Sequence, residues 1–140
     1  MRNTYSASTS NSGILRGEMY DAGIKSPPYP NAAHHIVPIH TEYCPTASDL
    51  LEEYGISKNA AVNGVFLPYK HNKYVTTESM HTGNHLTDYY KEVDRRFQKA
   101  REIIEKEKLN NSDARDYIVN VLQSIRADVM DGRLKTNKSK

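Results

Sequence analysis

The sequence predicts an α+β fold, and two observations lead to that prediction. Short runs rich in β-branched and aromatic residues, at 34–39 and 62–68, carry the proline and Asn-Gly signals of short strands. From Leu86 onward, apolar residues instead recur at steps of three and four, which is the period of amphipathic helices. The chain has 140 residues, which allows one domain with a single modest core. We therefore expect short strands in its first half and long helices in its second.

Polar segments flank the predicted domain. Residues 1–13, rich in Ser, Thr and Asn, are expected to be a disordered linker or a remnant of cloning. Residues 133–140 are expected to be a flexible basic tail, which leaves 14–132 as the domain. Its first segment predicts a short helix that stops at Gly23, before a proline-rich stretch that must be extended or turning.

The two strand patterns have different boundaries. The first covers 34–39, where Pro38 marks an edge or an end of the strand. The second follows a turn at Asn63-Gly64 and stops at Pro68, which is typical of a hairpin element.

A short helix is predicted between these strands. It starts at Thr46, whose hydroxyl would form a capping box with Asp49, and it ends at Tyr54. Gly55 then occupies the position after the helix where a left-handed residue is common.

Two long helices are predicted at the carboxy end. The first covers about 86–109, and the second covers 113–131 with Ser112 as its amino-terminal cap and Gly132 after its last turn. Tyr89 and Tyr90 lie at the start of the first helix, where the helical phase makes at least one of them a core residue. Charges of both signs alternate along the same helix, so its basic residues are expected to form a solvated, salt-bridged face.

Composition excludes several classes of protein. A net charge of +2 permits nucleic-acid binding without indicating it. Cys44 is the only cysteine, so there is no internal disulfide, and a metal would need nitrogen and oxygen ligands. No apolar run approaches the roughly 18 residues of a membrane helix, and the amino terminus lacks the apolar core of a secretory signal. We therefore expect no membrane insertion, and export only by another segment or machine.

All six histidines lie between residues 34 and 85, which indicates an assembled site. His81 and His85 are four residues apart, so on a helical turn both imidazoles would project from one face and share a metal. A metalloprotease would have a glutamate directly after the first of them, where this chain has Thr82.

His34 and His35 are adjacent, so on a regular strand they would point to opposite faces. Both could serve one site only at a strand end or a bend. One imidazole could then complete a three-histidine metal shell, while the other acts as a general base. The lone His40 is expected to be a surface or packing residue, and no role is expected for Cys44.

Three segments, taken in order, resemble a known family. They are Ala33-His34-His35-Ile36-Val37-Pro38, Asn63-Gly64-Val65-Phe66-Leu67-Pro68, and His81-Thr82-Gly83-Asn84-His85. Together they resemble the AHH-type nucleases of the HNH/endonuclease VII superfamily. That family is known mainly as the carboxy-terminal toxin domain of large bacterial polymorphic toxins. The resemblance covers a motif core at residues 33–90.

The resemblance implies a ββα-metal fold, in which a two-stranded hairpin and a helix hold one divalent ion, here with additional carboxy-terminal helices. By motif position, His34, His81 and His85 match the metal ligands. His35 matches the general base that activates water, and Asn63 matches the central asparagine that braces the hairpin loop and helps to orient the base. Apart from the resemblance, His71 lacks a motif partner and is expected, like His40, to be a surface or packing residue. Its neighbours Lys70 and Lys73 also make it a candidate for contact with phosphate, as they are themselves.

The implied function is a metal-dependent endonuclease that hydrolyses phosphodiester bonds, with DNA expected more than RNA and little sequence specificity. It would be secreted or delivered within a larger toxin, act in the cytoplasm of a target cell and be neutralised by a cognate immunity protein. The ion could be Mg²⁺, Mn²⁺, Ni²⁺ or Zn²⁺. Two alternatives stay open: an RNase toxin, and a non-catalytic zinc-stabilised module that binds nucleic acid or protein.

Overall fold

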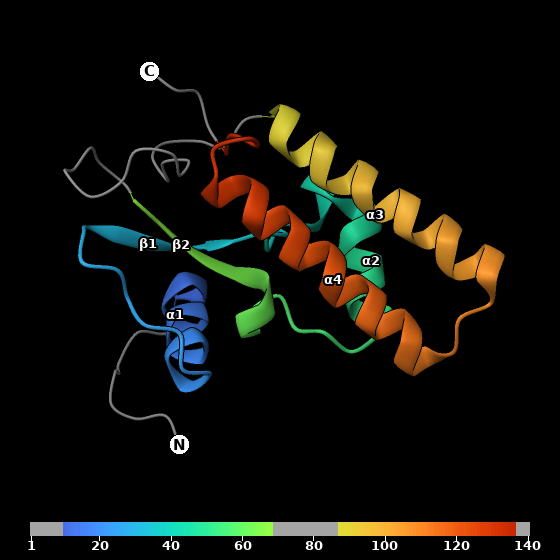
Figure 1. The fold of residues 1–140 in the computed structure, drawn as a ribbon, viewed down its shortest axis with the longest axis horizontal. Helices are drawn as coiled ribbons and strands as arrows, with labels where there is room; N and C mark the ends of the chain where they lie inside the picture. The colour runs from blue at the N-terminus through green and yellow to red at the C-terminus, as the bar shows by residue number, and fades with distance from the viewer. Residues whose placement is uncertain (1–9, 69–86, 137–140) are drawn as a thin grey trace.

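The computed structural model describes residues 10–68 and 87–136. Within these ranges a two-stranded antiparallel sheet lies between a short helix and a larger helical layer (Figure 1). The elements, in chain order, are α1 (Asn11–Asp21), β1 (Asn31–His35), the 3₁₀ turn η1 (Thr41–Tyr43), α2 (Pro45–Glu53), the 3₁₀ turn η2 (Ala61–Asn63), β2 (Gly64–Pro68), α3 (Thr87–Glu107) and α4 (Asn111–Met130). The α+β prediction is confirmed.

The register of the two strands, which are connected through η1, α2 and η2, sends alternate residues to two separate hydrophobic clusters. β1 and β2 pair from Asn31 opposite Pro68 to His35 opposite Gly64. Because side chains alternate along a strand, one face of the pair packs against α1 and the other against the helical layer. The cluster beside α1 contains Leu15, Met19, Ala33 and Phe66, whereas Val65 and Leu67 belong to the larger core.

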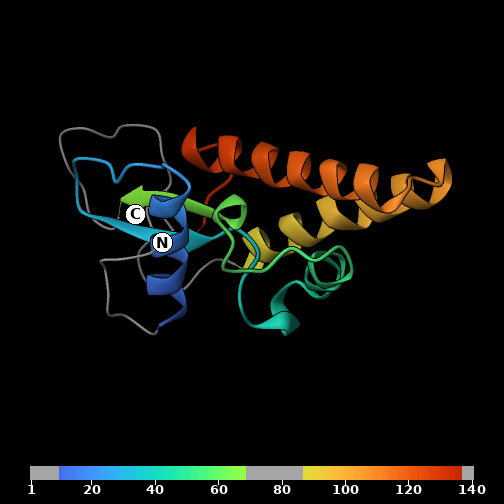
Figure 2. The same cartoon turned by 90° about the horizontal axis from the view of Figure 1, so that it is seen from below.

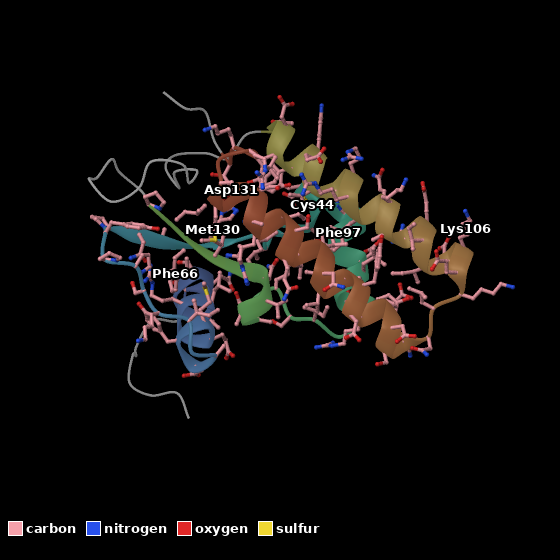
Figure 3. All side chains as sticks on the ribbon, in the orientation of Figure 1. Cys44, Phe66, Phe97, Lys106, Met130 and Asp131 are labelled. Carbon is pink, nitrogen blue, oxygen red and sulfur yellow. The ribbon has the colours of Figure 1, made fainter. Side chains whose placement is uncertain are left out.

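The larger core is built mainly by α3 and α4, which run antiparallel with α2 packed beside them (Figures 1 and 2). Its buried residues follow the predicted helical period, and they include Val93, Phe97, Ile104, Ile118, Leu122, Ile125 and Val129. Phe97 lies in this core and Phe66 in the cluster beside α1, as the labels of Figure 3 show. None of the described helices is long and apolar enough to cross a bilayer.

The strand predicted at 34–39 is wrong in its position, because β1 ends at His35. After His35 the backbone turns toward the larger core, where Ile36 and Val37 are fully buried. The Ile36 amide donates to the backbone oxygen of Asn63, and the Val37 amide donates to the Asn63 side chain. These bonds satisfy the two amides without a strand ladder, so β-branched residues here fill the core and do not extend the sheet.

The predicted capping box of the middle helix is also wrong. α2 starts at Pro45, and the side chain of its N-cap, Cys44, makes no cap bond. The Ala47 amide instead donates to Asp94 Oδ1 of α3, over 2.8 Å. A carboxylate is favourable at a helix amino terminus, so a tertiary contact caps this helix.

Other helix boundaries follow the sequence more closely. α4 is capped by Asn110, whose side chain accepts from the Asp113 amide at 2.8 Å, and not by Ser112. α1 begins at Asn11, so the last three residues of the expected linker 1–13 are helical. The expected helix-ending glycines all have positive φ, as predicted: Gly23, Gly55 and Gly132, at 88°, 72° and 80°.

Gly64 serves a different purpose from the expected hairpin turn. Its φ of −117° is open to any residue, and the preceding turn is the 3₁₀ turn η2. A Cβ at Gly64 would lie 2.6 Å from Met19 Sδ and 2.9 Å from Leu15 Cδ1. The glycine therefore permits the close approach of β2 to α1.

Candidate functional site

His34 lies in β1 and points toward α3. Its ring is fully buried, and its Nε2 lies 2.9 Å from the hydroxyl of Tyr89, in the first turn of that helix. The Tyr89 hydroxyl in turn donates to the backbone oxygen of Ile36 at 2.7 Å. Burial raises the pKa of Tyr89 well above its usual value, so the hydroxyl keeps its proton. Tyr89 of α3 and the backbone after β1 thus fix the orientation of the His34 ring.

His35 is the last residue of β1 and has different neighbours. Its half-buried ring places Nε2 2.7 Å from Asn59 Oδ1. Asn59 is itself held by Ser57 Oγ, which accepts from its backbone amide at 3.0 Å, and by Asn11, whose Oδ1 accepts from its side-chain amide at 3.3 Å. His35 also lines a hollow of about 340 Å³, together with Asn11, Ser12, Ala33, Pro38, Ile39 and His40.

The surroundings of His35 favour the neutral imidazole. Burial lowers its pKa below the usual value, the nearby Lys58 ammonium lowers it further, and the hydrogen bond to Asn59 opposes both effects. A neutral ring can accept a proton, so at pH 7 His35 is in the state that a general base requires.

Asn63 braces the chain directly after the two histidines. Its side chain is fully buried, and its Oδ1 accepts from the Val37 amide at 2.9 Å. Its Nδ2 donates to the backbone oxygens of Val37, at 3.0 Å, and Lys58, at 2.8 Å. One amide therefore joins the segment after His35 to the segment that carries Asn59. This is a bracing geometry of the kind that the sequence suggested for Asn63, while a contribution to catalysis stays a prediction.

Among residues 10–68 and 87–136, the two adjacent imidazoles contact different partners. His34 contacts α3, whereas His35 contacts Asn59 beside the start of α1. The other residues predicted for the site, namely His81, His85, His71, Lys70 and Lys73, lie outside the described residues. Across 10–68 and 87–136, no three His, Cys, Asp or Glu side chains are grouped as a metal site would require.

His34 nevertheless has the chemistry of a metal ligand. An imidazole suits divalent transition metals, and such ligands are commonly oriented by a hydrogen bond at their second nitrogen, as Tyr89 provides here. Its ring lies beside the first turn of α3, and His85 precedes Thr87, the first residue of that helix, by two positions in the sequence. The position of His34 is therefore compatible with its predicted role as a metal ligand together with His81 and His85.

His40 and Cys44 have neighbours that are consistent with the structural roles expected for them. His40 is exposed, with its ring edge-to-face with Tyr43. Cys44 is fully buried, and burial raises the pKa of its thiol to about 12, which is consistent with a packing role.

Two arginines of α3, Arg95 and Arg96, are paired with carboxylates, as the alternation of charges predicted. Arg95 and Arg96 each lie 2.8 Å from Glu92, and Arg96 also lies 2.9 Å from Asp128 of α4. Hydrogen bonds from the two guanidinium groups lower the pKa of Glu92 to about 2.

Comparison with known proteins supports one family. A search of curated proteins and a search of solved structures each gave no match. A family model described as a nuclease family of the HNH/ENDO VII superfamily with conserved AHH matches residues 15–129. That match spans most of the chain, and it includes both described histidines of the site, Asn63 and the two long helices. The chain therefore belongs to the AHH nuclease family, and nucleic acid is its substrate.

Proposed function

We propose that this nuclease is a metal-dependent endonuclease that hydrolyses phosphodiester bonds of DNA with little sequence specificity. The observation that carries the proposal is the placement of His35. Its neutral, half-buried imidazole lines an open hollow and is hydrogen-bonded to Asn59. Asn59 is in turn hydrogen-bonded to Ser57 and Asn11. A general base must be both oriented and reachable, and this arrangement supplies both properties.

The hydrogen bond to Asn59 supports Nδ1 as the reacting nitrogen of His35. Asn59 directs its side-chain amide toward Asn11, so its oxygen faces His35 and accepts from Nε2–H. Nδ1 of His35 is then the nitrogen with a free lone pair. It would take a proton from water as the water oxygen bonds to phosphorus. The 3′ oxygen would leave with the electron pair of its bond to phosphorus and take a proton from solvent, which gives a 3′ hydroxyl and a 5′ phosphate.

The separate partners of the two histidines support separate roles. In this proposal His34 binds the ion together with His81 and His85, and His35 does not bind it. A bound divalent ion would supply positive charge to stabilise the phosphate and the departing oxygen. Imidazole ligands suit Zn²⁺ and Ni²⁺, while Mg²⁺ and Mn²⁺ are frequent partners of phosphate, so all four belong in the test.

The proposal extends to biology through the resemblance of the three motifs to polymorphic toxin domains. We infer that the domain is delivered within a larger secreted toxin, acts in the cytoplasm of a target bacterium and is blocked by a cognate immunity protein. Induced expression of the wild-type chain in a bacterial host should then arrest growth and degrade the chromosome. Normal growth with intact chromosomal DNA would contradict the antibacterial role.

Incubation of the purified protein with nucleic acid tests the enzymatic proposal. We expect supercoiled plasmid DNA to be nicked or linearised in the presence of at least one of Mg²⁺, Mn²⁺, Ni²⁺ and Zn²⁺, and to stay intact with chelator. Cleavage of RNA alone would favour the RNase alternative. Failure to cut either nucleic acid with all four metals would overturn the proposal.

A further inference from the structure

The hydrogen bonds of Tyr89 determine which ring nitrogen of His34 carries the proton. A tyrosine hydroxyl has one proton, and here that proton goes to the backbone oxygen of Ile36, which can only accept, at 2.7 Å. The Tyr89 oxygen must therefore accept from His34 Nε2, which lies 2.9 Å away. His34 thus carries its proton on Nε2.

We propose that Tyr89 is a positioning residue that fixes His34 in the Nε2–H tautomer, so that His34 binds the metal through Nδ1. The inference rests on the proposed function only in taking His34 as a ligand. A neutral imidazole has one lone pair in its plane, and that lone pair binds the metal. With the proton held on Nε2, Nδ1 is the nitrogen that can coordinate.

The surroundings of the pair make this orientation stable. His34 and Tyr89 are both buried, to 0% and 1% exposure, so water does not compete for their hydrogen bonds. Their rings meet edge-to-face with centroids 5.4 Å apart, which limits rotation of the imidazole. The third member, Ile36 O, belongs to the segment that the Ile36 amide ties to Asn63. A chain of contacts therefore runs from Asn63 through Ile36 and Tyr89 to His34.

Nitrogen NMR of the histidine rings in the metal-free wild-type protein tests the tautomer directly. His34 is assigned by the loss of its signals in His34→Asn. We expect the proton on Nε2 and an unprotonated Nδ1. A proton on Nδ1 would overturn the inference, and this readout requires neither a variant of Tyr89 nor any enzymatic activity.

Tyr89→Phe tests the positioning role, because it keeps the ring and removes only the hydroxyl. We expect the Nε2–H tautomer to lose its dominance and the affinity for Zn²⁺ and Ni²⁺, measured by calorimetry, to fall about 10- to 100-fold. Tyr117→Phe, which removes a hydroxyl from partly buried Tyr117 of α4, should leave both readouts unchanged. A folded Tyr89→Phe protein with wild-type tautomer and affinity would contradict the proposal.

Cadmium bound to labelled wild-type protein identifies the coordinating atom. Scalar coupling from the metal to Nδ1 of His34 is expected, and coupling to Nε2 would overturn the inference. None of these measurements requires nuclease activity, so they test the role of Tyr89 independently of the endonuclease proposal. If the wild-type protein cuts no nucleic acid but shows the expected tautomer, affinity loss and coupling, the endonuclease proposal fails and the role of Tyr89 stands.

Discussion

At the scale of single residues, the hydrogen bonds of three buried or half-buried side chains, Asn59, Tyr89 and Asn63, organise the site. Asn59 holds His35, and Tyr89 holds His34. Asn63 joins the backbone after the two histidines, at Val37, to the backbone before Asn59, at Lys58. Each bond lies where water has restricted access, so loss of one partner would leave a polar group unsatisfied, at a cost of about 1 to 3 kcal/mol. The site is therefore sensitive to substitutions that change a single donor or acceptor.

Asn63→Asp should destabilise the protein by about 3 kcal/mol at pH 7. The substitution keeps the shape of the side chain but replaces two donated hydrogen bonds with a buried charge that faces the oxygens of Val37 and Lys58. Urea denaturation followed by circular dichroism measures the change. Asn120→Asp makes the same chemical change at an exposed position of α4 and should shift stability by less than about 0.5 kcal/mol. Equal effects of the two substitutions would refute the bracing role.

The pH dependence of cleavage should reflect the lowered pKa of His35. The neutral imidazole is the active base, so the rate should rise with pH and reach half its plateau below the usual histidine value of about 6.5. In Asn59→Ala the hydrogen bond that raises this pKa is lost, so the midpoint should move to still lower pH. The plateau should fall roughly 10-fold, because the ring is no longer oriented. A midpoint that rises in Asn59→Ala would contradict the assignment.

Sequence reasoning could identify the histidines but not the residues that hold them. His34, His35 and Asn63 belong to short motifs whose order is visible in the chain. Asn59 lies 24 residues from His35 in a connection without periodicity, and Tyr89 lies 55 residues from His34. The helical phase correctly predicted that Tyr89 or Tyr90 is buried, but a period carries no information about the partner of a hydroxyl.

At the scale of elements, close contact with α1 positions the strand pair, and a carboxylate of α3 caps α2. The sequence predicted the helices well, because their apolar period and terminal glycines are local signals. It placed β1 three residues too late, since burial of Ile36 and Val37 in the larger core imitates a strand pattern. It also assigned α2 a local cap, because the carboxylate of Asp94 is distant in sequence.

Gly64→Ala should destabilise the protein by about 1 to 3 kcal/mol, because the added methyl group would overlap buried Met19 and Leu15. Gly17→Ala provides the matched control within α1. A Cβ at Gly17 has no atom within 4 Å, and alanine favours a helix interior by about 1 kcal/mol over glycine. Thermal unfolding should therefore show a lower Tm for Gly64→Ala and a higher Tm for Gly17→Ala. The opposite order would mean that β2 and α1 are not in close contact.

At the scale of the whole molecule, the described core is built from α2, α3, α4 and one face of the strand pair. Burial of this large apolar cluster is a source of stability that requires no ion. We therefore predict that the protein stays folded without metal, whereas a module that folds only around zinc would not.

Chelator should therefore remove activity without unfolding the protein. We expect the helical circular dichroism signal to stay within about a tenth of its value after dialysis against chelator, while plasmid cleavage is lost and then returns on addition of metal. Loss of helicity on chelation would instead favour the zinc-stabilised binding module that the histidine pattern also permits.

The most direct test of the central claim is plasmid cleavage by His35→Ala beside His40→Ala, with metal affinity measured on the same samples. Both histidines line the same hollow, but only His35 is held by Asn59. We predict that His35→Ala binds metal as the wild-type protein does and loses cleavage by about 100-fold or more, the usual contribution of a general base, while His40→Ala retains both properties. Wild-type cleavage by His35→Ala, or loss of its metal affinity, would contradict the assignment of His35 as the base.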